Sequence, residues 1–322
     1  MTNTNKSNRP FVFVRCLTYN HEKYIEDALK GFVMQKTDFP FVVVIVNDAS
    51  PDGTKEVIRN FLLEHCSKES LSEEKTEYAT IIHAINKDNV NCELVVYNLY
   101  QNHYGKKPQR QYYQAFVDKA TYWAECEGDD YWTDPYKLQK QVDFMETHPD
   151  YVACCHNAIV ASEGNRRLFN SLNESNYPTT QEIIERDWFI PTASMVYRHK
   201  IVKYPSWSTQ IVNSDYLLVL LLAQQGKIYY MQDVMSVYRR HQGGMSYSIQ
   251  QNIIKFNEGL IQLMKNTKEL YGGEHSDSFD KAIGKYQTRK KEAEREMKYP
   301  WLKYLYRRTY KRMIKQWLRR YI

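Results

Sequence analysis

Two runs near the start of the chain are apolar at odd and even positions alike, and they constrain the fold more than any other feature. They are "FVFVRCL" at residues 11–17 and "FPFVVVIVND" at residues 39–48. Neighbouring side chains of a strand point to opposite faces, so such strands need protein on both faces of their sheet. A helical pattern follows each run, at 25–35 and at 55–65. Strand, helix, strand, helix with short connections predicts an α/β protein with a doubly wound, mostly parallel sheet flanked by helices.

The chain continues this pattern to about residue 147 and is less regular beyond it. In the first part we predict strands at 78–85, 93–99 and 121–126, helices at 107–120 and 135–147, and a polar loop at 66–76. In the second part we predict strands at 151–162, 227–231 and 234–241, a strand-like segment at 188–198 that Pro191 interrupts, and a helix at 214–226. Three helical stretches are expected from about residue 249 onward.

The composition is that of a soluble globular protein, with 43% hydrophobic and 25% charged residues. The six cysteines show no Cys-x-x-Cys spacing, so we expect reduced thiols in a cytoplasmic protein. The polar opening does not resemble a signal peptide, and the longest apolar run, at 217–223, is too short to span a bilayer. No Gly-x-Gly-x-x-Gly follows the first predicted strand, which argues against a dinucleotide-dependent dehydrogenase.

The predicted strand at 121–126 ends in a concentration of negative charge. Glu127, Asp129 and Asp130 lie within four positions of one another in "EGDDYW". Carboxylates this close repel each other and raise each other's pKa values, and a divalent cation is the simplest compensation. The alternative is a solvated turn that caps the strand.

Polar residues also follow the first two predicted strands. Thr18 and Asn20 come after the first, and Asp48 ends the second. In open α/β sheets, ligands bind beyond the carboxyl ends of the strands. These residues and the acidic cluster are therefore expected to converge on one site.

Four motifs, in the order "LTYN", "VNDASPDGT", "NHYGKKPQR" and "EGDDYW", resemble glycosyltransferase family 2 of the bacterial surface-polysaccharide type over roughly residues 11–245. The resemblance implies the GT-A fold and a metal-dependent, hexosyltransferase-like enzyme that inverts the configuration of the transferred sugar. It implies a nucleotide-sugar donor, most simply a UDP-sugar, and a carbohydrate or lipid-linked acceptor. It divides the chain into a flexible N-terminus at 1–10, a catalytic domain at 11–248 and a helical extension at 249–322, the catalytic domain having a donor half at 11–132 and an acceptor half at 133–248.

The resemblance gives the acidic cluster its roles. Asp129 corresponds to the ligand of Mg²⁺ or Mn²⁺, and Asp130 to a residue that binds the acceptor or orients the other carboxylates. Glu127 stands where the family usually has Asp, and with Gly128 it is assigned to the donor. His241 is a second candidate for the metal, or for a phosphate.

The remaining assignments are scattered along the chain. Asp48 is expected to accept a hydrogen bond from the base, Arg110 to hold the base edge or the diphosphate, and Asp215 to deprotonate the acceptor. Thr18, Asn20 and Glu22 are assigned to the ribose segment, and Arg239 and Arg240 to the diphosphate.

Simpler interpretations remain open for these residues. Asp48 suits a turn cap, Arg110 a surface helix, and Asp215 the positive end of a helix dipole. The segment 237–246 is equally an exposed basic loop. Trp132, Trp188 and Trp207 suit core packing as well as sugar stacking.

Two other function classes compete with glycosyl transfer. A nucleotidyltransferase would need a Gly-rich, basic phosphate loop after the first strand, and "LTYNHEKY" contains no glycine. A nucleotide-binding module without catalysis, anchored by a basic tail, is the second. Loss of function on replacing Asp129 would speak against it.

The last part of the chain is strongly basic. Residues 297–322 carry nine Lys or Arg and no acid, whereas residues 1–296 carry 35 basic and 38 acidic side chains. A helix here would place an apolar stripe on one face, made of Leu302, Tyr306, Tyr310, Met313, Trp317 and Tyr321. This pattern is typical of a helix that lies on an anionic membrane, and it also suits docking on a partner or on the protein's own body. No nucleic-acid-binding motif is present, so no nucleic acid is expected as a partner.

If the tail binds membranes, the chain should be peripheral on the inner face of the cytoplasmic membrane. The full chain is expected to co-sediment with anionic liposomes, less so at high salt, because each basic residue near an anionic surface contributes about 1 kcal/mol. A chain that ends at Glu296 should stay in the supernatant. Equal binding by both chains, or by neither, would argue for docking on the body or on a partner.

Overall fold

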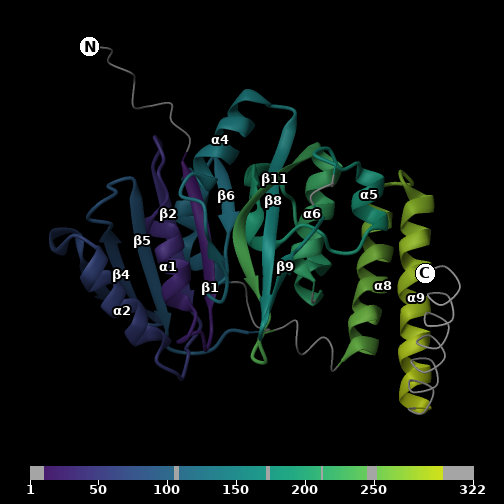
Figure 1. Cartoon of the computed structure of the whole chain (residues 1–322), viewed down its shortest axis with the longest axis horizontal. Coiled ribbons are helices and arrows are strands. Elements are labelled where there is room, and N and C mark those ends of the chain that lie inside the picture. Colours follow the sequence, from purple (N-terminus) through teal and green to yellow (C-terminus); the bar gives the residue numbers. More distant parts are fainter. Residues whose placement is uncertain (1–10, 105–108, 172–174, 212, 245–251, 300–322) are drawn as a thin grey trace, which may run out of the picture.

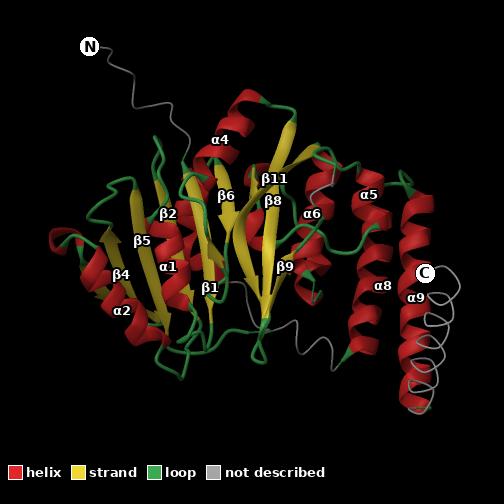
Figure 2. Ribbon diagram, in the orientation of Figure 1, coloured by secondary structure: helices red, strands yellow, loops and turns green. Residues whose placement is uncertain are grey.

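The computed structural model describes residues 11–104, 109–171, 175–211, 213–244 and 252–299 (Figures 1 and 2). One mixed sheet runs through the described residues in the strand order β3-β4-β5-β2-β1-β6-β10-β8-β11-β7, with β9 paired to β8. Helices cover both faces of this sheet (Figure 2). The predicted α/β class and doubly wound architecture are confirmed.

The first half holds the predicted parallel strands: β1 (Val12–Thr18), β2 (Phe41–Asn47), β5 (Cys92–Leu99) and β6 (Tyr122–Glu125). The connecting helices are α1 (Ile25–Val33), α2 (Thr54–His65) and α3 (Gln114–Lys119), the last preceded by the 3₁₀ turn η3 (Gln109–Tyr113). β4 (Ala79–Ile85) runs antiparallel to β5.

The prediction of a polar loop at 66–76 is wrong in part. It contains the 3₁₀ turn η2 (Lys68–Ser70) and the edge strand β3 (Ser72–Lys75), which pairs with β4. All four residues of β3 are exposed, so the strand carries no apolar alternation by which its sequence could be recognised.

The second half holds β7 (Tyr131–Trp132), β8 (Tyr151–Ser162), β9 (Asn165–Leu168), β10 (Val196–Tyr197) and β11 (Lys227–Arg239). Its helices are α4 (Lys137–Thr147), α5 (Thr180–Glu185) and α6 (Ser214–Gln225), with the 3₁₀ turns η4 (Thr192–Ser194), η5 (His199–Ile201) and η6 (Ser206–Gln210). The two strands predicted at 227–241 are one strand, β11, whose register against β8 shifts between Met231 and Ser236. This irregularity interrupts the apolar pattern and makes one strand look like two.

The two faces of the sheet carry separate cores. In β2, Val42, Val44 and Val46 pack into one core, and Val43 and Ile45 pack into the other. α1, α2 and α4 cover the second core, while α6 covers the first. The continuous apolar run of this strand therefore has the physical cause inferred from the sequence.

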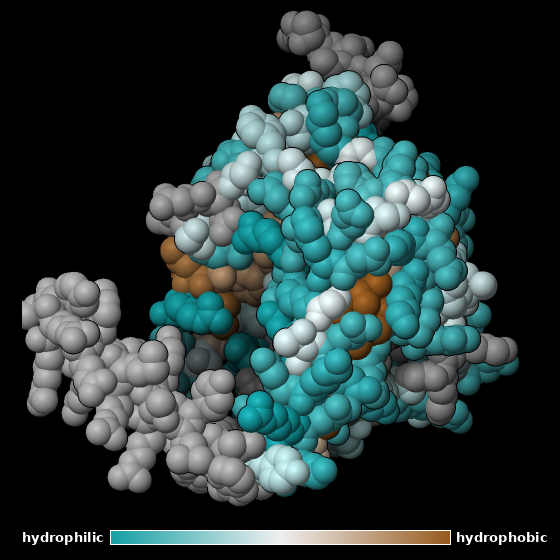
Figure 3. Space-filling model, turned by 90° about the vertical axis from the view of Figure 1, so that its right-hand side faces the viewer, coloured by the Kyte–Doolittle hydropathy of each residue, from teal (hydrophilic) through white to brown (hydrophobic). Residues whose placement is uncertain are grey.

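Two long helices, α8 (Ile253–Leu270) and α9 (Ser276–Lys298), lie side by side at one end of the molecule (Figure 1). Leu263 and Phe279 place them in the same core as α6, and Arg289 forms an ion pair with Asp187 at 2.7 Å. Hydrophilic side chains cover most of the surface on this side (Figure 3). The predicted third helical stretch, with the basic tail, lies outside the described residues. No helix of the described part combines the length and the apolar character needed to cross a membrane.

Gly31 marks the closest approach between α1 and the strand β7. A Cβ atom at this position would lie 2.9 Å from the backbone nitrogen of Trp132. Backbone cannot move aside as a flexible side chain does, so α1 needs glycine here in spite of its low helix propensity.

We expect Gly31→Ala to lower the free energy of unfolding by at least ~1 kcal/mol, because the clash outweighs the gain in helix propensity. Gly259→Ala in α8 is the matched control, since a Cβ atom there meets nothing within 4 Å. The control should be neutral or stabilising by up to ~1 kcal/mol. Urea unfolding of both variants measures the difference, and equal effects would contradict the close approach.

Candidate active site

The acidic turn at 127–130 is pressed against the end of β1. The backbone N–H of Gly128 donates to the carbonyl oxygen of Leu17 at 2.9 Å. A Cβ atom on Gly128 would lie 2.6 Å from Oγ1 of Thr18 and 2.9 Å from Cδ1 of Ile25. Glycine is therefore required at 128 for the turn to approach the strand this closely.

A second set of contacts joins the turn to the end of β11. Asp130 is 5% exposed, and its Oδ1 accepts a hydrogen bond from the backbone N–H of Arg239 at 2.8 Å. The guanidinium of Arg239 donates to the carbonyl oxygen of Asp129 at 3.0 Å and forms an ion pair with Asp27. It also lies over the ring of Tyr131, 4.3 Å from its centroid. Asp130 and Arg239 thus fix the turn to the end of β11.

This arrangement brings two histidines to Asp129. Nε2 of His241 lies 3.0 Å from Oδ2 of Asp129, and Nε2 of His21 lies 3.8 Å from the same oxygen. One ligand atom from each of the three residues lies within 4.8 Å of the other two. Nδ1 of His21 is buried and has no hydrogen-bond partner in the described part of the protein. Two imidazoles and a carboxylate at this spacing fit a divalent cation.

The electrostatics of the cluster favour the same occupant. Burial is the main cause that lowers the pKa of His21, so its imidazole is neutral at pH 7, which is the form that binds metals. Burial alone would raise the pKa of Asp129, but the hydrogen bond with His241 and the nearby imidazole of His21 hold it below its usual value. Asp129 is therefore ionised at pH 7, with the neutral imidazole of His21 beside it.

Glu127 lines the open side of the turn. Its side chain is exposed, and the protein around it removes part of the water from the carboxyl group. That desolvation, followed by the charge of Asp129, raises the pKa of Glu127 to about 8. The charge of Asp215 adds to the rise, and the charge of Arg15 opposes it.

Asp215 lies in the first turn of α6 and is half-buried. Its Oδ1 accepts a hydrogen bond from the N–H of Tyr216 at 2.8 Å. Burial raises the pKa of Asp215 above its usual value, and the charge of Glu125 contributes to the rise. A carboxyl group with a raised pKa is better suited to accept a proton than an ordinary surface aspartate.

The loops after β1 and β2 are fixed to each other by hydrogen bonds. The backbone N–H of Asn20, which has a positive φ of 58°, donates to Oγ of Ser50 at 3.0 Å. Ser50 in turn donates to Oδ1 of Asn47 at 2.6 Å. Thr18 is buried, and its Oγ1 has no hydrogen-bond partner in the described residues. Oε2 of Glu22 accepts the N–H of Gly53 at 3.2 Å, which ties the same two loops together.

Asp48 follows β2 directly, and its carboxylate holds the loop after β5. Oδ1 accepts the backbone N–H of His103 at 2.8 Å. Of Arg110 the structure describes only the backbone, in η3. Arg240 extends the pairing of β11 with β8, donating its N–H to the carbonyl oxygen of Ala161 at 2.7 Å. Asp48 therefore joins the loop after β2 to the loop after β5.

Two parts of the site are not among the residues predicted from the sequence. The first is His21, whose partners lie more than a hundred positions away, so spacing gives no signal. The second is an ion pair between Arg15 and Glu125 at 2.9 Å, to which Tyr197 donates a hydrogen bond. Arg15 and Glu125 are register partners on β1 and β6. Opposite charges inside two apolar runs are a signal that predicts such a pair.

Comparison with known proteins gives one family. Residues 16–75 match the family model described as glycosyl transferase family 2. Uncharacterized proteins of Mycobacterium bovis and Mycobacterium tuberculosis are 31% identical over 244 residues, which is 75% of this chain and 62% of theirs. The chain thus spans less than two thirds of the length of these relatives.

Solved structures share the fold. S. aureus TarS residues 1–349, in complex with UDP-GlcNAc, superimposes with a TM-score of 0.57 at 17% identity and covers 87% of this chain and 72% of that one. The mannosyltransferase PcManGT from Pyrobaculum calidifontis, in complex with GDP-Man and Mn²⁺, gives a TM-score of 0.52 at 14% identity, covering 88% and 75%. At these identities the likeness shows the GT-A fold.

We expect His21→Ala and His241→Ala each to weaken Mn²⁺ binding by about 10- to 100-fold, because each removes one nitrogen ligand. His83→Ala is the matched control, since His83 lies on β4, outside the cluster. Titration calorimetry at pH 7 measures all three. Wild-type affinity in His21→Ala would exclude His21 from the metal site.

Proposed function

We propose that this chain, which belongs to glycosyltransferase family 2, transfers a sugar from a nucleotide donor to an acceptor hydroxyl with inversion at the anomeric carbon. The observation that carries the proposal is the convergence of His21, Asp129 and His241 at the carboxyl ends of β1, β6 and β11. Ligands of open α/β sheets bind at this edge. A nucleoside diphosphate leaving group requires positive charge there. The three side chains can bind a divalent cation that supplies this charge.

The donor set favours Mn²⁺ over Mg²⁺. Mg²⁺ prefers oxygen ligands throughout, whereas two of the three ligands offered here are imidazole nitrogens. PcManGT was solved with Mn²⁺. A bound divalent cation supplies charge that stabilises the departing diphosphate.

We propose a UDP-sugar as the donor. TarS was solved with UDP-GlcNAc and PcManGT with GDP-Man, so nucleotide sugars as a class suit the fold. We assign the selection of the base to Asp48, which is half-buried directly after β2, because its carboxylate can accept a hydrogen bond. Thr18 at the end of β1 accepts the N–H of Asp48 at its carbonyl oxygen, and Asn20 lies in the loop that follows. The guanidinium of Arg239 is already held by Asp27 and Tyr131. We therefore propose that Arg239 positions the acidic turn.

Asp215 is the better candidate for the base. Asp130 is buried and bonded to the N–H of Arg239, so it orients the turn rather than meeting an acceptor. In the proposed step, the acceptor hydroxyl gives its proton to Asp215 as its oxygen bonds to the anomeric carbon. The bond from that carbon to the diphosphate oxygen breaks at the same time, and its electron pair leaves with the nucleoside diphosphate.

For the acceptor, we propose a carbohydrate or lipid-linked glycan in cell-surface glycan synthesis. The basic segment 297–322 supports this, because it suits attachment to the inner membrane face where lipid-linked acceptors lie.

The function is tested by incubating the full chain with a panel of nucleotide sugars and Mn²⁺, and measuring nucleotide release. UDP or GDP should appear together with free or transferred sugar. Release of pyrophosphate from a nucleoside triphosphate and a sugar phosphate would instead indicate a nucleotidyltransferase.

We expect Asp215→Asn to keep donor affinity within about twofold and to lose turnover by ~100-fold or more, because the amide preserves shape and removes basicity. Asp277→Asn is the matched control, since Asp277 also lies in the first turn of a helix, α9, away from the site. It reports the loss of a favourable helix-dipole contact alone. Wild-type turnover in Asp215→Asn would place the base elsewhere.

A further inference from the structure

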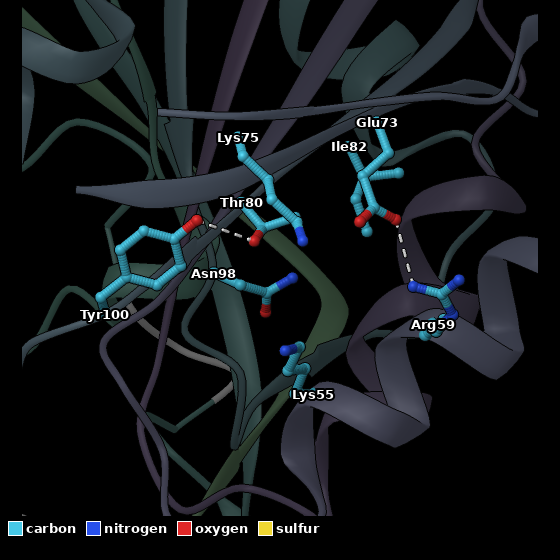
Figure 4. A pocket seen from close by; sticks show the side chains of 8 residues that line it. All are labelled: Lys55, Arg59, Glu73, Lys75, Thr80, Ile82, Asn98 and Tyr100. Carbon is cyan, nitrogen blue, oxygen red and sulfur yellow. Dashed lines mark hydrogen bonds and ion pairs between the residues drawn. The ribbon is translucent and has the colours of Figure 1, made fainter. Parts of the chain in front are cut away.

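A cavity of about 310 Å³ lies between α2 and the outer strands of the sheet (Figure 4). Lys55 and Arg59 reach it from α2, Glu73 and Lys75 from β3, and Asn98 from β5. Thr80 and Ile82 of β4 complete its wall. None of the residues of the cation cluster (His21, Asp129 and His241) lines this cavity, so it is separate from the site described above.

The charged groups of the cavity are mostly donors. Arg59 forms an ion pair with Glu73 at 3.1 Å. Lys55 and Lys75 form no ion pair with any carboxylate among the described residues. Figure 4 shows both ammonium groups directed toward the amide of Asn98. The cavity therefore holds two uncompensated positive charges.

Asn98 is the most buried of the polar residues that line the cavity, with only 5% of its surface exposed. Its Oδ1 accepts a hydrogen bond from Nδ2 of Asn47 at 3.0 Å. That bond fixes the orientation of the amide and directs Nδ2 into the cavity (Figure 4). Nδ2 donates to no acceptor in the described part of the chain, so it is available to an acceptor that enters the cavity.

These groups define the chemistry of the ligand. Two ammonium groups and an amide N–H₂ all donate, and the hydroxyl pair of Thr80 and Tyr100, 3.2 Å apart, lies at the same wall. A compact oxyanion with several acceptor oxygens matches such a set better than a neutral or cationic group. The volume also leaves room for a small organic group beside the anion.

We propose that this cavity binds the phosphate group of a phosphorylated ligand. The phosphate oxygens accept from Nζ of Lys55, Nζ of Lys75 and Nδ2 of Asn98. Because Asn98 is bonded to Asn47, and Asn47 through Ser50 to the backbone of Asn20, the ligand meets the hydrogen-bond network that holds the loop after β1. The proposal does not depend on glycosyl transfer.

The test is titration calorimetry of the full chain with inorganic phosphate, in EDTA so that no cation recruits the phosphate elsewhere. The double variant Lys55→Ala/Lys75→Ala should bind at least ~10-fold more weakly, because it removes two charge-assisted contacts. Asn98→Asp should weaken binding to a similar extent, since it keeps an oxygen for Asn47 and places a negative charge in the cavity. Lys200→Ala, an exposed lysine of η5, is the matched control and should change affinity less than ~2-fold.

Two further arms identify the source of the phosphate. A monoester, glycerol 1-phosphate, represents a small phosphorylated molecule or a chain end, and glycerophosphoglycerol represents an internal diester of a chain. Tighter binding of either one supports the site and names its source. Phosphate affinity that is unchanged in the double lysine variant would overturn the proposal, as would absence of saturable binding of all three probes to the wild type. The lysines are exposed, so the double variant still decides if Asn98→Asp fails to fold.

Discussion

The hydrogen bond from the N–H of Arg239 to Asp130 joins two parts of the sheet that are far apart in the sequence. β6 ends in the acidic turn, and β11 arrives more than a hundred residues later. With this bond in place, His241 lies two residues beyond Arg239 and beside Asp129. The close packing of Gly128 against Thr18 then brings the same turn to β1, where His21 follows. The cation cluster depends on both contacts.

The three neighbouring carboxylates coexist because their surroundings differ. Asp130 is buried and bonded to backbone, and burial followed by the charge of Asp129 raises its pKa well above the usual range. Asp129 faces two imidazoles and stays ionised. Glu127 faces the open side with a raised pKa. Like charges within a few ångströms are tolerated where each environment favours a different protonation state.

The helical extension packs against α6, the helix that carries Asp215. Tyr271 at the end of α8 donates its hydroxyl to the carbonyl oxygen of Leu220 in α6 at 2.7 Å. Ser278 of α9 donates to Glu185 at the end of α5, and Tyr216 of α6 donates to carbonyl oxygens of that segment. α8 and α9 thereby support the helix whose first turn carries Asp215. The boundary predicted at residue 249 divides the chain by sequence pattern, while one core crosses it.

Side-chain periodicity records which faces are buried, and so the amino-acid sequence predicts the class of fold and most of the strands and helices. The sequence also predicts that carboxylates gather at a strand end, since the three lie in one short segment. The sequence does not predict that His21 and His241 meet at Asp129, or that Asn98 turns its amide into a cavity with Lys55 and Lys75; these arrangements follow from the folded structure. These contacts join residues dozens to hundreds of positions apart, and no local pattern encodes which strand ends become neighbours. That choice is made by the packing of the whole sheet.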